Sequence, residues 1–226
     1  MARAEAQATA AVSRPWTLQQ EVRADRGVQK TVHFLLKESE HRYPVIRLRA
    51  LLEKYDLAPF PCVAADRAKD FLCRIQSLVP PRVSAAIFRT YYKGWCTASR
   101  FGRRAGCIFG CQDLPDRLGH YLVCPVATGF ARSRLRLEVP QDPRSRRTAS
   151  LSLHLAGSSL TENEAIRRAI WLAAVYRVHC RFRRQPGQIQ KREVAQRALD
   201  QAVRDLTHGH RSACKIVDEL WRTVVV

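Results

Sequence analysis

The sequence has few acidic residues and no long apolar run. It carries 20 Asp and Glu against 39 Lys and Arg, which gives a formal net charge of +19 at pH 7. No segment reaches about 18 apolar residues without a charge, so we expect no membrane span. This excess of basic residues, most of them Arg, favours nucleic acid, through its phosphate backbone, or another polyanion as a partner. The alternative is a basic composition that serves no ligand.

Catalytic signatures are also missing. The sequence has no His-Glu-x-x-His motif, and no His-x-Glu followed by Pro-Cys-x-x-Cys. Zinc peptidases with the first motif and zinc deaminases with the second are therefore excluded. The closest approach to a nucleophile with its base is His179 beside Cys180, but adjacent helix residues point apart. We expect no enzymatic activity.

Targeting signals are weak. The first 30 residues lack a continuous apolar core, so no secretory signal is expected. Their Ala-rich start, with Arg3 and Arg14, can also be interpreted as a transit peptide, although Glu5 and the scarcity of Ser weigh against it. The basic run Arg144–Arg147 either contacts phosphate or acts as a nuclear-import signal, and short basic loops are also common without either role. We expect an intracellular protein, nuclear rather than cytoplasmic.

One short segment concentrates metal-binding residues. It reads CIFGCQDLPDRLGHYLVCP and has the spacing C-x3-C-x8-H-x3-C, in which the four ligand-type residues are Cys107, Cys111, His120 and Cys124. Three thiolates and one imidazole are a ligand set that suits tetrahedral zinc. Because all four positions would come from protein, such a site is structural and not catalytic. With three thiolates and a neutral imidazole, it would carry a net charge of −1.

Local residues around this segment suggest how it folds. Gly110 precedes the second cysteine, where the backbone must approach the metal-bound sulfur closely. Asp113, Pro115 and Asp116 are residue types that start helices. We therefore predict one short helix that carries the last two ligands at i and i+4 and is ended by the proline that follows them.

Two other interpretations of the four residues remain open. They could be two disulfide-prone cysteines with bystanders, or a reduced cluster within the core. The chain has eight cysteines, and the five outside this segment occur singly, mostly within helical patterns. That distribution is typical of reduced thiols in an intracellular protein and argues against disulfides.

The predicted fold class is mainly α. We expect a helical domain with a small embedded CCHC zinc module, followed by a C-terminal helical hairpin. The expected divisions are a disordered N-terminus (1–15), a helical region (16–104), the zinc module (105–126), a basic linker (127–160) and a C-terminal helical subdomain (161–226). Strand patterns are limited to 135–139 and 224–226.

Individual helices are predicted from apolar periodicity and from helix-ending residues. We expect helices over 66–78 and 84–100, separated by a stop at the Pro80-Pro81 pair. The strongest pattern covers 161–184, where Thr161 and Glu164 form a capping box. Two further helices follow over 191–206 and 211–222. The inward residues predicted for 191–206 are Val194, Ala198, Ala202 and Leu206.

Two basic surfaces are candidates for contact with nucleic acid. One lies directly before the zinc segment and comprises Arg100, Arg103 and Arg104. The other is a ridge at helical spacing, made of Arg177, Arg181 and Arg184. The aromatic residues near the first surface, Tyr91, Trp95 and Phe101, either pack in the core or stack on bases.

A wider pattern resembles a known family. Pro80–Arg82 gives a Pro-Pro-Arg helix start, Gly94–Phe101 reads GWCTASRF, and Cys107–Pro125 ends in HYLVCP; Ala174–Arg183 then reads AVYRVHCRFR. Together these runs resemble the region after the polymerase core of non-LTR retrotransposon reverse transcriptases, of the type abundant in dinoflagellate genomes. The resemblance covers about residues 75–185.

This resemblance implies a C-terminal, nucleic-acid-associated module with zinc on the four ligands named above, and the polymerase part of a parent polyprotein as a partner. It does not imply catalysis. The chain has no Asp-Asp pair for a two-metal polymerase site. The single Pro-Asp of a nuclease-type motif, Pro115-Asp116, has no acidic residue at 129–131. The alternative function is a non-catalytic, zinc-stabilised helical remnant or protein-interaction domain without a nucleic-acid role.

Overall fold

The computed structural model describes residues 48–50, 61–92, 94–111, 114–139, 161–183 and 192–222. All of them belong to one unit that spans Val45–Val226. The predictions for residues 1–15 and for most of the helical pattern up to Leu57 lie outside the described residues. Within the described part, no helix is both long enough and apolar enough to cross a membrane.

The mainly α prediction is confirmed. The described residues contain seven α-helices and one 3-10 helix, and the single β contact among them is an isolated bridge between Gly106 and Pro115. The elements, in order, are α5 (Pro61–Ile75), α6 (Pro81–Tyr91), η1 (Ala98–Phe101), α7 (Leu118–Tyr121), α8 (Pro125–Leu135), α10 (Glu162–Phe182), α11 (Arg192–Thr207) and α12 (Arg211–Arg222).

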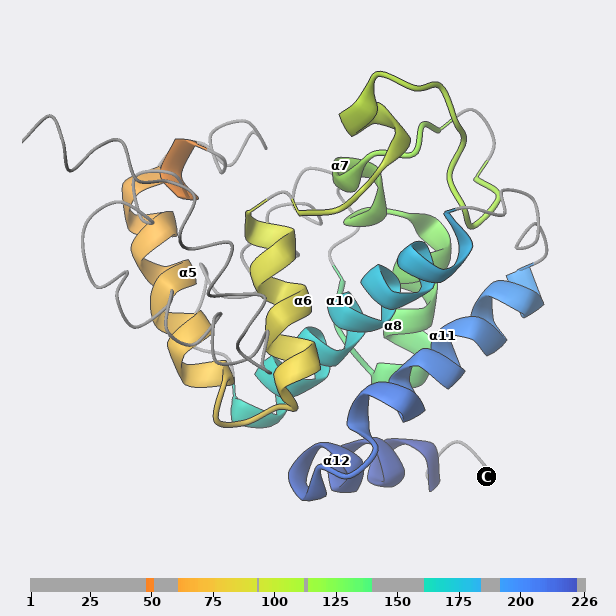
Figure 1. Cartoon of the computed structure of the whole chain (residues 1–226). Coiled ribbons are helices and arrows are strands. Elements are labelled where there is room, and N and C mark those ends of the chain that lie inside the picture. Colours follow the sequence, from red (N-terminus) through yellow and green to blue (C-terminus); the bar gives the residue numbers. More distant parts are fainter. Residues whose placement is uncertain are drawn as a thin grey trace, which may run out of the picture. The chain divides into compact units, whose positions relative to one another are not determined.

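Helix α10 lies at the centre of this arrangement and contacts α5, α6, α8, α11 and α12 (Figure 1). Eleven of its 21 residues are buried, so it is covered on more than one face, as expected for a core helix. The predicted N-cap is confirmed, because the Thr161 hydroxyl accepts a hydrogen bond from the Glu164 N–H at 3.2 Å. The Glu164 carboxylate instead accepts from Arg168, at 2.6 Å.

The Pro80-Pro81 pair separates α5 from α6, as predicted. The second helix begins earlier than expected, because Pro81 is itself the first residue of α6. Proline suits this position because the first helical N–H has no partner within the helix. Helix α6 also ends at Tyr91 and not near residue 100. Its end is followed by a close approach: a Cβ on Gly94 would lie 3.1 Å from the Arg89 carbonyl oxygen.

The predicted linker over 127–160 is partly wrong. Residues 127–135 belong to helix α8, which begins at Pro125. Apolar burial explains the helix, because Ala127, Phe130 and Ala131 face the core. The segment after α8 is irregular up to Val139, so the strand pattern at 135–139 is not realised. The rest of the predicted linker, from residue 140, lies outside the described residues.

Helices α10 and α11, which pack against one another, correspond to the predicted C-terminal hairpin, and α12 follows α11 after a turn at Gly209 with φ 76°. The predicted inner face of α11 is displaced. Ala202 and Leu206 are buried as expected, whereas Val194 and Ala198 are only partly covered. The buried set, which the structure centres one residue further along, is Ala195, Leu199, Ala202, Val203 and Leu206.

A side chain from α6 fixes the end of this pair. Arg82 donates from Nε to the Leu206 carbonyl at 2.8 Å and from Nη2 to the His208 carbonyl. Both carbonyls lie at the C-terminal end of α11, where helical carbonyls lack internal partners. The Pro-Pro-Arg run thus starts one helix and caps another.

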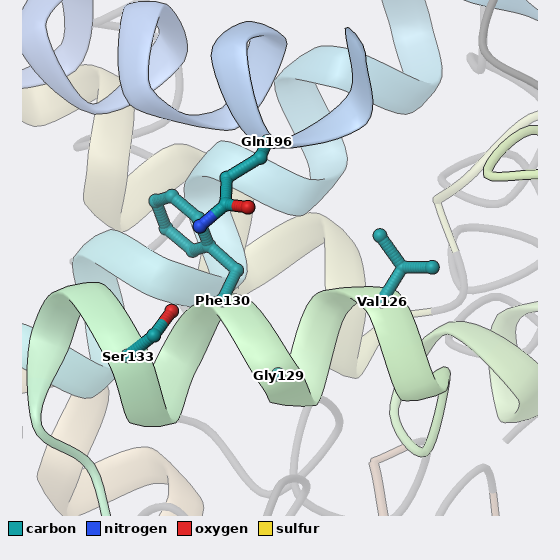
Figure 2. A pocket seen from close by; sticks show the side chains of 5 residues that line it. All are labelled: Val126, Gly129, Phe130, Ser133 and Gln196. Carbon is teal, nitrogen blue, oxygen red and sulfur yellow. The ribbon is translucent and has the colours of Figure 1, made fainter. Parts of the chain in front are cut away.

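A small hollow lies between α8 and α11. Figure 2 shows its lining side chains, Val126, Phe130, Ser133 and Gln196, with Gly129 at its floor. None of these side chains is titratable or a favoured metal ligand, and Ser133 has no base beside it among the lining residues. We assign no function to this hollow.

Candidate metal centre

The first two candidate ligands come from a tight turn. Gly110 has φ 73°, a left-handed conformation that glycine adopts without steric cost. Its N–H donates to the Cys107 carbonyl at 3.1 Å, and the Phe109 N–H donates to the Cys107 sulfur at 3.4 Å. The tight turn predicted at Gly110 is present, with the glycine in a left-handed conformation, and it brings the Cys107 and Cys111 side chains to the same side.

The last two ligands do not share a helix, which corrects the prediction. Helix α7 covers only Leu118–Tyr121 and carries His120. Cys124 is the residue before α8, with φ −57° and ψ 124°. Pro125 does not end a helix but begins α8. The i, i+4 spacing still brings both side chains to one place, because a turn connects two helices of different direction there.

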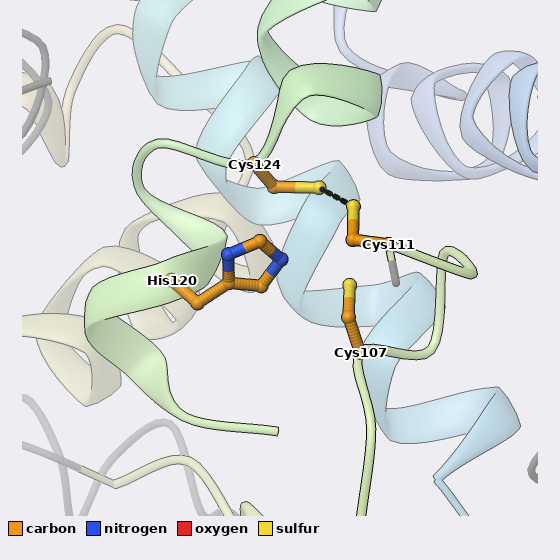
Figure 3. Close-up of side chains that lie close together, drawn as sticks. All are labelled: Cys107, Cys111, His120 and Cys124. Carbon is orange, nitrogen blue, oxygen red and sulfur yellow. Dashed lines mark hydrogen bonds between the residues drawn. The ribbon is translucent and has the colours of Figure 1, made fainter. Parts of the chain in front are cut away.

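The four side chains converge. One ligand atom from each of Cys107, Cys111, His120 and Cys124 lies within 4.8 Å of all the others. Figure 3 shows the two thiols of the turn facing His120 and Cys124, with 3.5 Å between the sulfurs of Cys111 and Cys124. Sulfurs bound to one tetrahedral zinc ion lie about 3.8 Å apart, from a Zn–S distance of about 2.3 Å. These residues could therefore hold a metal ion.

An unpaired buried atom supports that fit. The His120 Nε2 is buried and has no hydrogen-bond partner within the described structure, and the ring points at the three thiols (Figure 3). A buried polar atom without a partner costs free energy of about 1–3 kcal/mol. Coordination of a cation by this nitrogen would remove that cost.

The thiols are not paired as disulfides. The 3.5 Å between Cys111 and Cys124 exceeds a disulfide bond of about 2.05 Å, and all seven cysteines with a described side chain are free. Hydrogen bonding to Cys111 raises the pKa of Cys107 to about 12. The hydrogen bonds from Cys107 and Cys124 hold the pKa of Cys111 well below its usual range. One negative charge is thus favoured among the three sulfurs, and a bound dication would allow all three to ionise.

Asp116 connects this centre to the helical core. Its Oδ2 accepts from the Ala98 N–H at 2.6 Å, and its Oδ1 accepts from the Tyr121 hydroxyl at 2.7 Å. The same Oδ1 lies 3.1 Å from His179 Nε2 of α10. Tyr121 in turn accepts from the Ile108 N–H at 3.2 Å. One carboxylate therefore links η1, the first turn of the centre, α7 and α10.

Burial and pairing act in opposite directions on these groups. Burial alone would raise the pKa of Asp116, but hydrogen bonds from His179, Ala98 and Tyr121 hold it below its ordinary value. Burial would likewise lower the pKa of His179, yet the bond to Asp116 raises it. Burial is the main reason that the pKa of Tyr121 is raised. The Asp116–His179 contact therefore has the character of an ion pair in a protected site.

Aromatic rings surround this network. The Trp95 ring centroid lies 5.6 Å from that of Tyr121, 5.2 Å from that of Tyr176 and 5.2 Å from that of His179. The Trp95 Nε1 donates to the Thr90 hydroxyl at 2.9 Å. Trp95 is therefore a core residue, and Tyr91 is also buried. Of the two alternatives for these rings, packing in the core or stacking on bases, the structure favours packing in the core.

Phe101 differs from those two rings, because 59% of it is exposed. Arg100, Arg103 and Arg104 are exposed beside it. Arg100 is partly engaged: its Nη1 donates to the Trp95 carbonyl at 3.3 Å, and its guanidinium lies 5.9 Å from the Phe101 ring centroid. The first predicted basic surface is thus solvent-facing and adjoins the metal centre.

The second predicted surface is mixed in charge. Arg177 pairs with Asp205 of α11 at 3.0 Å, and the guanidinium of Arg181 lies 5.4 Å from the Phe182 ring centroid. Arg184 lies outside the described residues. Because α11 places an acidic residue against Arg177, this ridge offers fewer unpaired cations than its sequence spacing suggests.

Sequence reasoning missed the polar links around the centre. The sequence predicts Asp116 as a helix-start residue and places His179 on a helix without a partner, but the two contact one another across 63 positions. A signal was present: Trp95, Tyr121 and His179 each lie in one of the runs on which the family resemblance rests. Arg117, which follows Asp116 and is exposed, was also missed as a neighbour of the first basic surface.

Comparisons with known proteins add no assignment to this geometry. No family model, curated protein or solved structure matches the chain. The resemblance to a retrotransposon module therefore stays a prediction from the motifs.

Proposed function

We propose that the metal is zinc and that its role is structural. Three sulfurs and one nitrogen form the ligand set that zinc prefers, and all four come from the protein, which leaves no position for a substrate. Cys107, His120 and Cys124 are buried and Cys111 is half-buried, so the site is enclosed by its own module. Zinc here would fix the turn and α7 against α10.

We further propose that the module binds the backbone of RNA or DNA. The observation that carries this proposal is the continuous exposure of residues 99–106, which contain Arg100, Arg103 and Arg104. Among the described residues of 97–124, the one acidic side chain is that of Asp116, which is buried and paired with His179. In the described part of this segment, phosphate would meet arginines without a competing carboxylate, and Arg suits phosphate because of its forked donors.

The proposed origin is a retroelement polyprotein, in which this chain corresponds to the region after the polymerase. In support, three of the four runs that carry the resemblance meet, because Trp95 and Tyr121 pack against His179. The fourth, Pro80–Arg82, begins α6 and caps α11. We propose a non-catalytic role, a nuclear location and the polymerase part of such a polyprotein as a partner. Arg177, Arg181 and Arg184 remain a secondary surface in this proposal.

Nucleic-acid binding is tested by a salt titration of the full chain, loaded with zinc, against fluorescent single-stranded and duplex oligonucleotides. The double variant Arg103→Gln/Arg104→Gln should bind more weakly. The slope of log K against log salt on single strands should become shallower by about 1.4, since each phosphate contact contributes about 0.7. The matched control is Arg74→Gln/Arg211→Gln, which removes the same charge from exposed positions on α5 and α12.

Equal slopes for both double variants would show that overall charge, not this surface, attracts nucleic acid. No binding by the wild type would overturn the proposal and favour the alternative, a zinc-stabilised helical remnant or protein-interaction domain.

A further inference from the structure

Exposed apolar surface is concentrated beside the metal centre. Within the described residues, the exposed large hydrophobic side chains are Phe101, 59% exposed, and Leu114, 39% exposed. The rings of Tyr91, Trp95 and Tyr121 are buried. A single exposed hydrophobic residue is ordinary. Phe101 is unusual because it is an exposed aromatic ring with arginines on both sides of it in the sequence.

The backbone beneath Phe101 is fixed. Gly102 ends η1 with φ 67° and donates to the Ser99 carbonyl at 3.4 Å. The Arg103 N–H donates to the Ala98 carbonyl at 2.9 Å. The start of η1 is bound in turn by the Asp116 carboxylate. A ring on such a turn loses little conformational freedom when a ligand covers it, which favours binding.

Several exposed cations lie close to Phe101 in the chain or beside η1. Arg103 and Arg104 follow Phe101 directly and are exposed. Arg117 adds a third exposed cation, since the preceding residue accepts the Ser99 N–H at 3.1 Å and so holds it beside η1. Arg100 lies over the ring itself, 5.9 Å from its centroid. An exposed aromatic ring can stack on a nucleobase, and arginines near it can bind the phosphates on either side of that base.

We infer that Phe101 is a stacking platform for an unpaired base of single-stranded nucleic acid. Arg103, Arg104 and Arg117 bind the phosphates on either side, and Arg100 holds the ring in place. In a duplex the base faces are already stacked, so this ring selects single strands. The inference rests on the proposed nucleic-acid binding and adds the class of ligand and the residue that distinguishes it.

The test compares four exposed-site variants of the full, zinc-loaded chain by anisotropy with single-stranded RNA, single-stranded DNA and a duplex. Phe101→Leu keeps an apolar side chain without a ring, and Phe101→Trp keeps a ring. Leu114→Ala removes the other exposed apolar side chain, and Arg103→Gln/Arg104→Gln removes cations. Zinc content and circular dichroism verify that each variant is folded.

We expect Phe101→Leu to bind single strands roughly 5- to 150-fold more weakly, with duplex binding and the salt slope unchanged. Phe101→Trp should retain affinity, and its added tryptophan fluorescence should be quenched when a single strand binds. Leu114→Ala should bind like the wild type. The RNA and DNA arms show which polymer supplies the base.

The two proposals fail in different ways. If Phe101→Leu binds single strands like the wild type while the double arginine variant binds more weakly, the stacking platform is wrong and the basic surface stands. If Leu114→Ala weakens binding as much as Phe101→Leu, the patch is an apolar face suited to a protein and not a stacking site. If neither the ring nor the arginines affect binding, both proposals fail.

Discussion

The metal module and the C-terminal helices are built by different physical means. Among the described residues from Thr97 to Cys124, the regular structure is limited to a four-residue 3-10 helix, a four-residue α-helix and one bridge. Its order comes from directional contacts, above all those of Asp116. Helices α10, α11 and α12 are instead ordered by apolar faces that pack together.

This difference predicts how each region responds to change. Apolar packing is spread over many side chains, so the loss of one contact is partly absorbed by its neighbours. A network of buried polar groups has few members, and each unsatisfied one carries its full desolvation cost. We therefore expect the module to depend on a few residues and the helices to tolerate many substitutions.

The largest expected effect is that of metal removal. Apparent binding free energies for zinc at structural sites are about 10–16 kcal/mol, and they are coupled to folding. We expect Cys111→Ser, or a chelator, to remove one equivalent of zinc and to make residues 97–124 sensitive to protease. Most far-UV circular dichroism should remain, because α10 and α11 have their own core.

The matched control is Cys73→Ser, since Cys73 is an exposed thiol on α5. It should leave zinc content and protease resistance unchanged. Full unfolding of the chain on metal loss would contradict the separation of the two regions. If the wild-type protein binds no metal, the module is not stabilised by zinc.

Asp116→Asn is expected to have the next largest effect. The amide keeps the shape of the side chain but removes the negative charge facing His179, which is itself fully buried. Removing one partner of a buried pair costs about 3–5 kcal/mol. Chemical denaturation of the zinc-loaded protein should show a loss of this order, with zinc still bound before unfolding.

A double-mutant cycle with His179→Gln separates the pair from its surroundings. The double variant should lose less stability than the two single variants added together, because the second substitution costs less once the first is made. Independent effects that simply add would show that the two residues stabilise the fold through other contacts.

The same pair predicts a pH dependence of smaller size. The pKa of His179 is raised and that of Asp116 is lowered. The histidine's contribution is therefore complete below its unfolded pKa of about 6.5 and is lost as pH rises through the higher folded value. The aspartate's contribution is present above its unfolded pKa of about 3.9 and is lost as pH falls through the lower folded value.

The free energy of unfolding of the wild type minus that of His179→Gln should thus be largest between about pH 4 and pH 6.5. The upper limb is the better one to measure, because zinc ligands become protonated at low pH. A difference that stays constant from pH 6 upward would show that folding leaves the pKa of His179 unchanged, and a difference that grows with pH would show that His179 is kept neutral in the folded protein.

The sequence was most informative where its signals are local. The Thr161 cap, the left-handed Gly110 and the convergence of four metal-type side chains were all predictable from neighbouring residues. Element boundaries were harder. Proline is compatible with both the end and the start of a helix, and at Pro81 and Pro125 burial of the following residues decided for the start.

Long-range polar contacts could not be predicted from the pattern. Nothing in the local sequence distinguishes an aspartate that caps a helix from Asp116, whose partner lies 63 residues away. The register of α11 was missed for a related reason: alanines on several faces leave the apolar stripe ambiguous, and packing against α10 selects Ala195 and Leu199.

The smallest effect is expected on the surface of the helical region. Arg177 and Asp205 form an ion pair at 3.0 Å, but their side chains are 48% and 35% exposed. Exposed pairs of this kind contribute about 0–1 kcal/mol, less at high salt. Arg177→Gln should therefore change the free energy of unfolding by less than about 1 kcal/mol.

Arg177→Gln should also leave the salt slope of nucleic-acid binding close to that of the wild type, because Asp205 already neutralises this arginine. If Arg177→Gln reduces the salt slope as much as the loss of Arg103 does, the nucleic-acid-binding surface lies on α10 and not on the metal module. The module would then serve only as a scaffold.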